Sequence, residues 1–141
     1  MKIDPILGFA LLFCVAGCSS VKTSSLHCSS LSCEEQGLIH SDLNRMLVGD
    51  GFTAASASEV PWGMAWSNDS FSPLWTGRAY FQVGAAMNPT GMDIDVCYYR
   101  GAVSANNALV DAIVACVQHD APSSKVKIEA KAGYSPSYFK E

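Results

Sequence analysis

Two carboxylates stand two residues apart in Asp93-x-Asp95, and this spacing suggests possible chemistry. Such a pair on one strand face could bind a metal ion or act as a general acid and base. A hard metal ion needs several more oxygen ligands, and the turns beside this pair offer few. The alternative is a solvated strand face, opposite the lysines of the last strand, and we favour it. We therefore predict no metal site.

Catalytic constellations are incomplete elsewhere in the sequence. No serine stands in a Gly-x-Ser-x-Gly turn, and there is no glycine-rich phosphate loop. His119 and Asp120 are adjacent, but neighbours in sequence rarely orient each other as the members of a triad do. Cys97 and Cys116 could be nucleophiles only as reduced thiols. We therefore expect a protein that is not an enzyme, has no catalytic residues and needs no cofactor.

Aromatic residues are concentrated in residues 62–75, which hold all three tryptophans of the chain. Large aromatic side chains often dominate small cores. Trp is also enriched at binding hot spots and at membrane surfaces. The segment is therefore either core or an exposed platform for a partner protein, a glycan or a small ligand. In the second case the candidate binding residues are Trp66, Phe71 and Trp75.

The amino terminus has the layout of a secretory signal peptide. One lysine, Lys2, precedes an apolar run, and small residues end it in Val15-Ala16-Gly17-Cys18. This ending resembles the lipobox of bacterial lipoproteins. The resemblance implies that residues 1–17 are removed and that the Cys18 thiol carries diacylglycerol. The apolar stretch is roughly 11 residues, short of the ~20 that span a bilayer, which disfavours an uncleaved anchor. A plain secreted protein is the other alternative.

The resemblance also implies a location. A bacterial lipoprotein is held in the cell envelope by its lipid, and Ser19, rather than an acidic residue, follows Cys18. By similarity to enteric lipoproteins, this implies the outer membrane, with the protein facing the periplasm. Residues 18–31 are then the lipidated cysteine and a flexible tether, because Ser19 to Ser25 is rich in Ser and Thr.

Four cysteines follow Cys18, and an even number in an exported chain indicates two disulfides. We predict the pairs Cys28–Cys33 and Cys97–Cys116. Simple alternation places Cys97 on the polar face of its strand, so the second bond requires a bulge or twist. Two rival pairings, Cys28–Cys97 with Cys33–Cys116 and Cys28–Cys116 with Cys33–Cys97, stay open. So does the alternative of buried free thiols.

The pattern of apolar residues predicts the secondary structure. Ser32 and Glu35 form a capping box ahead of a helix. Apolar residues recur with a helical period in 33–48 and 105–118. They alternate with polar residues, as in strands, in 78–87, 92–99 and 125–131. The first two of these form a hairpin around the turn Asn88-Pro89-Thr90-Gly91. Weaker strand patterns occupy 52–57 and 62–66.

These elements predict one domain over residues 32–141. Each clear strand has one apolar and one polar face, which is typical of an antiparallel sheet covered on one side. We therefore expect an α+β fold, a two-layer sandwich of two helices on one face of a mainly antiparallel sheet of about four strands. The net charge of −4 and the absence of a basic patch argue against nucleic acid as a partner.

The function that the sequence favours is a membrane-anchored envelope lipoprotein. We expect a non-enzymatic binding or assembly module that is attached to the membrane through Cys18 and contacts another envelope protein. The alternative is a small-ligand or glycan binder that uses the Trp-rich segment 62–75.

Overall fold

The computed structural model describes residues 22–55, 64–68, 81–98 and 103–132. In chain order, the elements within these ranges are β1 (Lys22–Ser29), α2 (Cys33–Gly49), β2 (Thr53–Ala54), β3 (Met64–Ser67), β4 (Phe81–Asn88), β5 (Gly91–Tyr98), α3 (Val103–Asp120) and β6 (Lys125–Ala132). No helix of these described ranges is long and apolar enough to cross a membrane.

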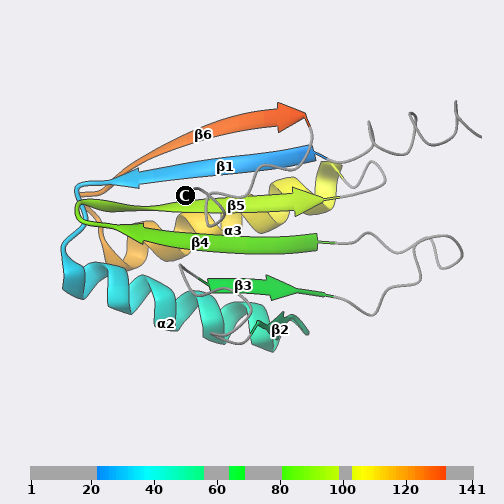
Figure 1. Ribbon diagram of the computed structural model, residues 1–141, viewed down its shortest axis with the longest axis horizontal. Coiled ribbons are helices and arrows are strands. Elements are labelled where there is room, and N and C mark those ends of the chain that lie inside the picture. The colour runs from blue at the N-terminus through cyan, green and yellow to red at the C-terminus, as the bar shows by residue number, and fades with distance from the viewer. Residues whose placement is uncertain (1–21, 56–63, 69–80, 99–102, 133–141) are drawn as a thin grey trace, which may run out of the picture.

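The strands form one six-stranded sheet in the order β2-β3-β4-β5-β1-β6, and every neighbouring pair is antiparallel. Figure 1 shows this order from β6 at the top to β3 and β2 at the bottom, with α3 behind the sheet. The predicted α+β class is confirmed. The sheet has six strands where about four were expected, because β1 was not predicted and both weaker patterns, at 52–57 and 62–66, contain strands, β2 and β3.

Strand β1 corrects the prediction of a flexible tether over residues 18–31. Residues 22–29 form an eight-residue strand that lies between β5 and β6. The composition was misleading because Ser and Thr are common in linkers, whereas Thr also fits a pleated strand. The informative residue is Leu26, which is fully buried and stands opposite Ile94 on one side and Ile128 on the other.

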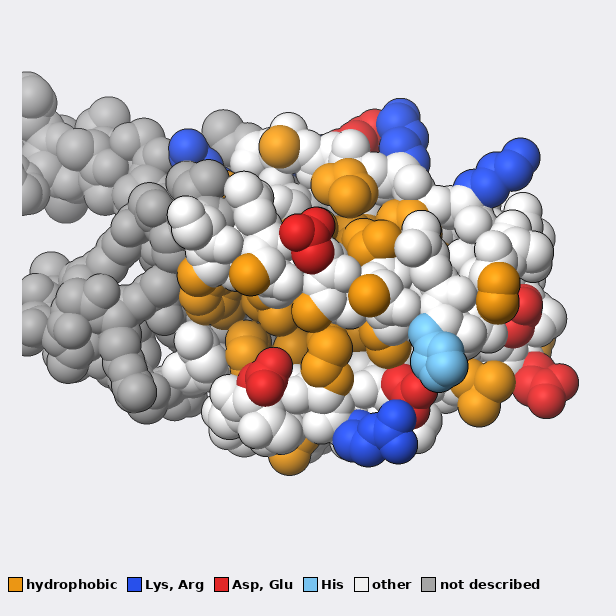
Figure 2. Space-filling view, turned by 180° about the vertical axis from the view of Figure 1, so that it is seen from behind, with side chains coloured by type: hydrophobic (Ala, Val, Ile, Leu, Met, Phe, Trp, Pro, Cys, Tyr) orange, Lys and Arg blue, Asp and Glu red, His pale blue; other side chains and the backbone are white. Residues whose placement is uncertain are grey.

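Both helices contribute to one hydrophobic core on the same face of the sheet, which we call the helix face. The side chains of this core alternate along the strands, as in Leu26, Ile94 and Val83, and meet one apolar stripe from each helix. The helix residues of the core are Ile39, Leu43 and Leu47 of α2 and Val110, Ile113 and Val117 of α3. Seen from the helix side, Figure 2 shows hydrophobic side chains in the middle of this face, between charged ones.

The predicted capping box is present at the start of α2. The Glu35 backbone N–H donates to Ser32 Oγ at 3.2 Å, and the Ser32 backbone N–H donates to Glu35 Oε2 at 2.7 Å. These bonds satisfy N–H groups that a helix start leaves without partners. They also hold the pKa of Glu35 below its ordinary value. The helix runs over Cys33–Gly49, in agreement with the predicted 33–48.

Hydrogen bonds tie each helix to a different part of the sheet. The Trp66 indole N–H donates to Asn44 Oδ1 of α2 at 3.0 Å, which links α2 to β3. The Asn106 side-chain amide of α3 donates to Ser24 Oγ of β1 at 3.1 Å. Both helices therefore lie on the helix face. The opposite face of β1 and β5 carries polar side chains, and no helix in the described part of the chain covers it.

The hairpin of β4 and β5 is confirmed around the predicted turn. Its register pairs Asn88 with Gly91 and continues to Phe81 with Tyr98. Gly91 also lies opposite Ser29 of β1, and a Cβ atom at this position would overlap the carbonyl oxygen of Cys28. Glycine is therefore required here by the close approach of the β1 backbone.

A candidate binding site on the polar face of the sheet

The polar face is the sheet face directed away from α2 and α3. On β1 it carries Thr23, Ser25 and His27, and on β5 it carries Asp93, Asp95 and Cys97, because successive side chains of a strand alternate between faces. Ser25 and Asp95 are each only 2% exposed, and Thr23 and Cys97 are also buried. Burial of polar groups is costly unless they are hydrogen-bonded, so we expect these buried polar side chains to have hydrogen-bond partners.

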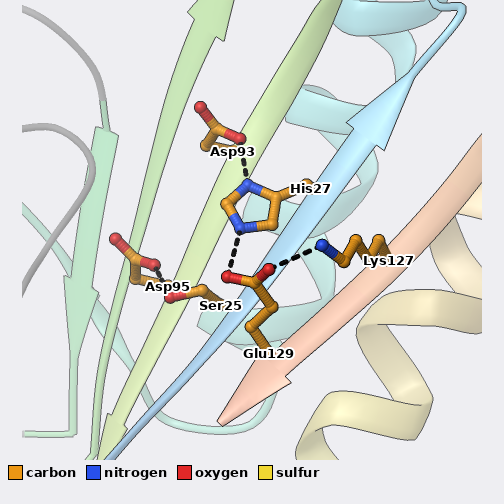
Figure 3. A network of polar contacts seen from close by, with 6 residues as sticks. All are labelled: Ser25, His27, Asp93, Asp95, Lys127 and Glu129. Carbon is orange, nitrogen blue, oxygen red and sulfur yellow. Dashed lines mark hydrogen bonds and ion pairs between the residues drawn. The ribbon is translucent and has the colours of Figure 1, made fainter. Parts of the chain in front are cut away.

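His27 is the centre of the polar cluster that Figure 3 shows. Its Nδ1 atom lies 2.7 Å from Asp93 Oδ1 on β5, and its Nε2 atom lies 3.4 Å from Glu129 Oε2 on β6. About a third of each side chain is exposed, at 34% for His27, 33% for Asp93 and 37% for Glu129. The imidazole therefore bridges two carboxylates across three adjacent strands while the cluster stays open to solvent.

Lys127 extends the cluster along β6. Its Nζ atom lies 2.7 Å from Glu129 Oε1, so the carboxylate of Glu129 is shared between a lysine and a histidine. The hydrogen bond and charge of Lys127, followed by the contact with His27, hold the pKa of Glu129 below its ordinary value. The same hydrogen bond and the charge of Glu129 raise the pKa of Lys127. Both groups are therefore charged at neutral pH.

A second polar contact lies deeper on this face. Ser25 Oγ donates a hydrogen bond to Asp95 Oδ1 at 2.6 Å, and both side chains are buried. Figure 3 shows this pair beside the His27 cluster, on the same two strands β1 and β5. A hydrogen bond to a carboxylate is stronger than one between neutral groups, so the pair fixes the register of these strands as well as the position of Asp95.

A hollow of about 330 Å³ adjoins the cluster at the end of the sheet where the hairpin turns. Its polar lining combines cationic, hydroxyl and amide groups with the His27–Asp93 pair: His27, Ser29, Asn88, Thr90, Asp93, Lys125 and Lys127. This volume is at the lower end of the range for small-molecule sites, roughly 300–1,000 Å³. Cys28, Gly91 and Val126 complete the lining, so the hollow combines an apolar wall with polar and cationic groups.

Both ring nitrogens of His27 face carboxylates, and the hydroxyl of Ser25 is directed to Asp95 rather than to His27. Among the described residues, no group of three or more His, Cys, Asp and Glu side chains is arranged to hold a metal ion. Such an arrangement can position charges for a partner, which is how electrostatic complementarity gives specificity.

The prediction placed Asp93 and Asp95 on one strand face correctly, but the solvated face that it favoured is wrong for Asp95, which is 2% exposed. The two carboxylates do share one strand face, but they pair with His27 and Ser25 of β1. The lysines of the last strand were expected opposite them. Strand β1 lies between β5 and β6, so those lysines are one strand farther away. Because β1 was not recognised as a strand, His27 was missed as a site residue, although it alternates with Leu26 and Cys28 in the sequence.

The predicted disulfides are absent, since Cys28, Cys33, Cys97 and Cys116 are all free thiols. The pair Cys97–Cys116 is wrong for a simple reason: Cys97 is on the polar face, whereas Cys116 is on α3 and packs against the core on the helix face. The bulge that this bond required does not occur in β5, whose register with β1 is continuous. Cys28 packs in the core while Cys33 is exposed at the start of α2.

Three of the four described thiols, those of Cys28, Cys97 and Cys116, are poor nucleophiles. Burial, followed by the nearby charge of Asp93, raises the pKa of Cys28 to about 11. Burial likewise raises the pKa of Cys97 to about 11, and it does the same for Cys116. A thiol attacks as the thiolate, and these three groups are protonated at neutral pH.

Trp66 is part of the core rather than of a binding platform. Its side chain is 2% exposed and its ring lies 6.4 Å from that of His40, centroid to centroid. The prediction of Trp66 as a binding residue is therefore wrong. Its indole N–H already donates a hydrogen bond to Asn44. The other two candidates, Phe71 and Trp75, and the lipidation candidate Cys18 lie outside the described residues.

No protein-family model, curated protein or solved structure matches this chain.

Proposed function

We propose that this protein is a lipid-anchored, non-enzymatic binding module of the bacterial cell envelope, attached to a membrane through Cys18 and bound to another envelope protein. The domain would be a two-layer sandwich held at the outer membrane and facing the periplasm. The observation that carries the binding role is the charged cluster of His27, Asp93, Lys127 and Glu129, held in place on a sheet face that no described helix covers.

The polar cluster supports recognition because its geometry is set before a partner arrives. Each side chain of the cluster has a polar partner within 2.7 to 3.4 Å, on strands that pair along their whole length. Rigid, partly exposed charges cost little to order on binding and can reject partners of the wrong charge.

The anchor is supported by the lipobox resemblance and by the position of β1. Strand β1 begins at Lys22, so only four Cα-to-Cα steps separate it from Cys18. That distance can be at most ~14 Å. A lipid on Cys18 would therefore hold the domain against the membrane surface, where a membrane-bound or membrane-proximal partner is within reach.

A small polar or anionic ligand in the adjoining hollow is the second candidate. Its support is the lining by Lys125, Lys127 and His27 around about 330 Å³. The glycan-binding alternative through residues 62–75 has lost the contribution of Trp66, which is buried.

The test begins with the anchor. Cells that produce the full-length chain are labelled with a radioactive or clickable fatty acid, and membranes are then separated from soluble proteins. We expect label on the wild-type protein and its recovery with the outer membrane, and loss of both in Cys18→Ala. An unlabelled wild-type protein with an intact Cys18 thiol would refute the anchor.

The binding role is tested on the same membranes. The tagged protein is extracted in mild detergent after crosslinking, and its partners are compared among the wild type, the double variant His27→Gln/Lys127→Gln and Arg45→Gln. Arg45 is a matched control on α2, exposed to 79% and far from the cluster in sequence and fold. We expect the double variant alone to lose a partner. Equal partner recovery in all three would exclude the cluster as the binding site.

A further inference from the structure

The two edges of the sheet differ in length. One edge is β2, a two-residue strand, whereas the other is β6, an eight-residue strand that pairs only with β1 in the described part of the chain. In Figure 1, β6 is the outermost strand at the top of the sheet. A long edge strand presents N–H and C=O groups to which another extended chain can add.

The side chains of β6 form two rows. The row on the helix face is apolar, and Ile128 in its centre is 51% exposed although its neighbour Leu26 on β1 is fully buried. The row on the polar face consists of Lys125, Lys127, Glu129 and Lys131, with Glu129 already occupied by Lys127 and His27. An incoming strand would therefore meet an apolar row and a row with an excess of positive charge.

A second copy of β6 does not satisfy this charge pattern. An antiparallel pair centred on Ile128 would bury the two isoleucines against each other and place Lys127 opposite Glu129 of the other copy. It would also place Lys125 opposite Lys131 at both ends. Like charges directly opposite each other are destabilising by amounts similar to the gain from opposite ones, so the attraction is offset.

We propose that the outer edge of β6 binds an extended segment of a partner protein in which acidic and apolar residues alternate, adding a seventh strand to the sheet. Three acidic side chains would lie opposite Lys125, Lys127 and Lys131, and the apolar side chains would cover Ile128. A fourth acidic side chain would face Glu129, so three opposite-charge pairs would stand against one like-charge pair. The inference rests on the proposed binding function, for which it names the edge and the chemistry of the partner. It needs no lipid on Cys18.

The test uses three fluorescent octapeptides and the full-length chain in detergent. The first peptide alternates Glu and Val, the second alternates Lys and Val, and the third has four Glu followed by four Val. We expect the first to bind, the second not to bind, and the third to bind more weakly, because it has the same charge without the alternation. Hydrogen exchange should slow at the backbone amides of β6 when the first peptide is added.

Charge variants sharpen the test. Lys125→Gln and Lys131→Gln should each weaken binding of the alternating acidic peptide by about 1.4- to 5-fold, the range of one cross-strand charge pair. Arg45→Gln removes the same charge from the exposed surface of α2 and should leave the affinity unchanged. Because all three residues are exposed, the thermal melts of these charge variants should match that of the parent. Ile128→Ala is a further variant, which keeps every charge.

Several results would overturn the inference. Equal binding of the alternating and the block acidic peptides would show a charge effect without strand addition. Slowed exchange outside β6 would place the peptide elsewhere, and a concentration-dependent dimer with slowed exchange in β6 would show that the occupant is a second copy. None of these results affects fatty-acid labelling of Cys18 or partner recovery from membranes, so the proposed function would fail or stand separately.

Discussion

The two faces of the β1–β5 ladder share one pair of backbones, but alternate residues give them opposite chemistry. On the helix face, Leu26 and Ile94 stand opposite each other and are fully buried in the core. On the polar face, one residue further along, Ser25 and Asp95 stand opposite each other and are equally inaccessible, with a 2.6 Å hydrogen bond between them. Alternation along a strand thus separates a stabilising surface from a polar one within a single ladder.

This comparison shows where the stability of the fold comes from, and it supports the proposed place of the binding site. Apolar burial is non-directional and scales with area, so the helix face can supply most of the folding free energy. The hydrogen bonds and ion pairs of the polar face depend on direction, and they add less net stability for each contact. The polar face can therefore change its partners at a lower cost to the fold.

The largest effect is expected on the helix face. Leu26→Ala should lower the free energy of unfolding by about 2–5 kcal/mol, because the side chain is fully buried and its cavity is not refilled. Ile128→Ala is the control in the same row at the exposed edge, and it should change stability far less. Urea denaturation measures both. A loss for Leu26→Ala no greater than that for Ile128→Ala would contradict the assignment of β1 to the centre of the sheet.

A smaller loss is expected from the buried polar pair. Ser25→Ala removes the donor to Asp95 and should cost about 1.5–3 kcal/mol, the range for a hydrogen bond to a charged group. Ser29→Ala, on the exposed end of the same strand, should have little effect. Chemical denaturation of both variants compares them directly. If Ser25→Ala is as stable as Ser29→Ala, the Ser25–Asp95 contact contributes no stability.

Glycine substitutions test the contact between the hairpin and β1. Gly91→Ala should destabilise by about 1–3 kcal/mol, because the added Cβ overlaps the Cys28 carbonyl and the backbones must separate. Gly37→Ala is the opposite case, since nothing lies near a Cβ at this position of α2. It should stabilise by about 0.5–1 kcal/mol through helix propensity. Thermal melts that shift in the same direction for both variants would rule out this geometry.

The smallest effect concerns the protonation of Glu129. Its folded-state pKa lies below the ordinary value of 4.5, first because of Lys127 and then because of His27. Its contribution to stability is therefore complete above pH 4.5 and is lost as the pH falls through the lower folded-state pKa. Carboxyl NMR titration should show this pKa moving up toward 4.5 in Lys127→Gln. An unchanged titration would show that the pair is not formed in solution.

Local patterns predicted much of the fold. The capping box of Ser32 and Glu35 depends on two side chains three residues apart, and α2 begins where they indicate. The β4–β5 hairpin follows from two alternating runs around a turn. Strand β1 could not be recognised in this way. Its Ser-rich composition has a weak intrinsic preference, and it is a strand because it fills the space between β5 and β6.

The site was less predictable than the fold because it depends on strand order. The sequence placed Asp93 and Asp95 on one face, but their partners come from β1, about 66 to 70 residues earlier in the chain. Without β1 between β5 and β6, the lysines of β6 were the natural partners for these carboxylates. The disulfide prediction failed for a related reason, since counting cysteines does not show that Cys97 and Cys116 are on opposite sides of the sheet.

The central claim is that partners bind on the side of the polar face and β6, and that the helix side serves stability. Photocrosslinking in intact cells tests it most directly, with a photoreactive residue placed in the full-length chain either at Lys127 or at Leu38. Lys127 is 74% exposed on β6, and Leu38 is 50% exposed on α2. We predict a discrete crosslinked product from position 127 and none from position 38. A product from position 38 with none from position 127 would contradict the claim.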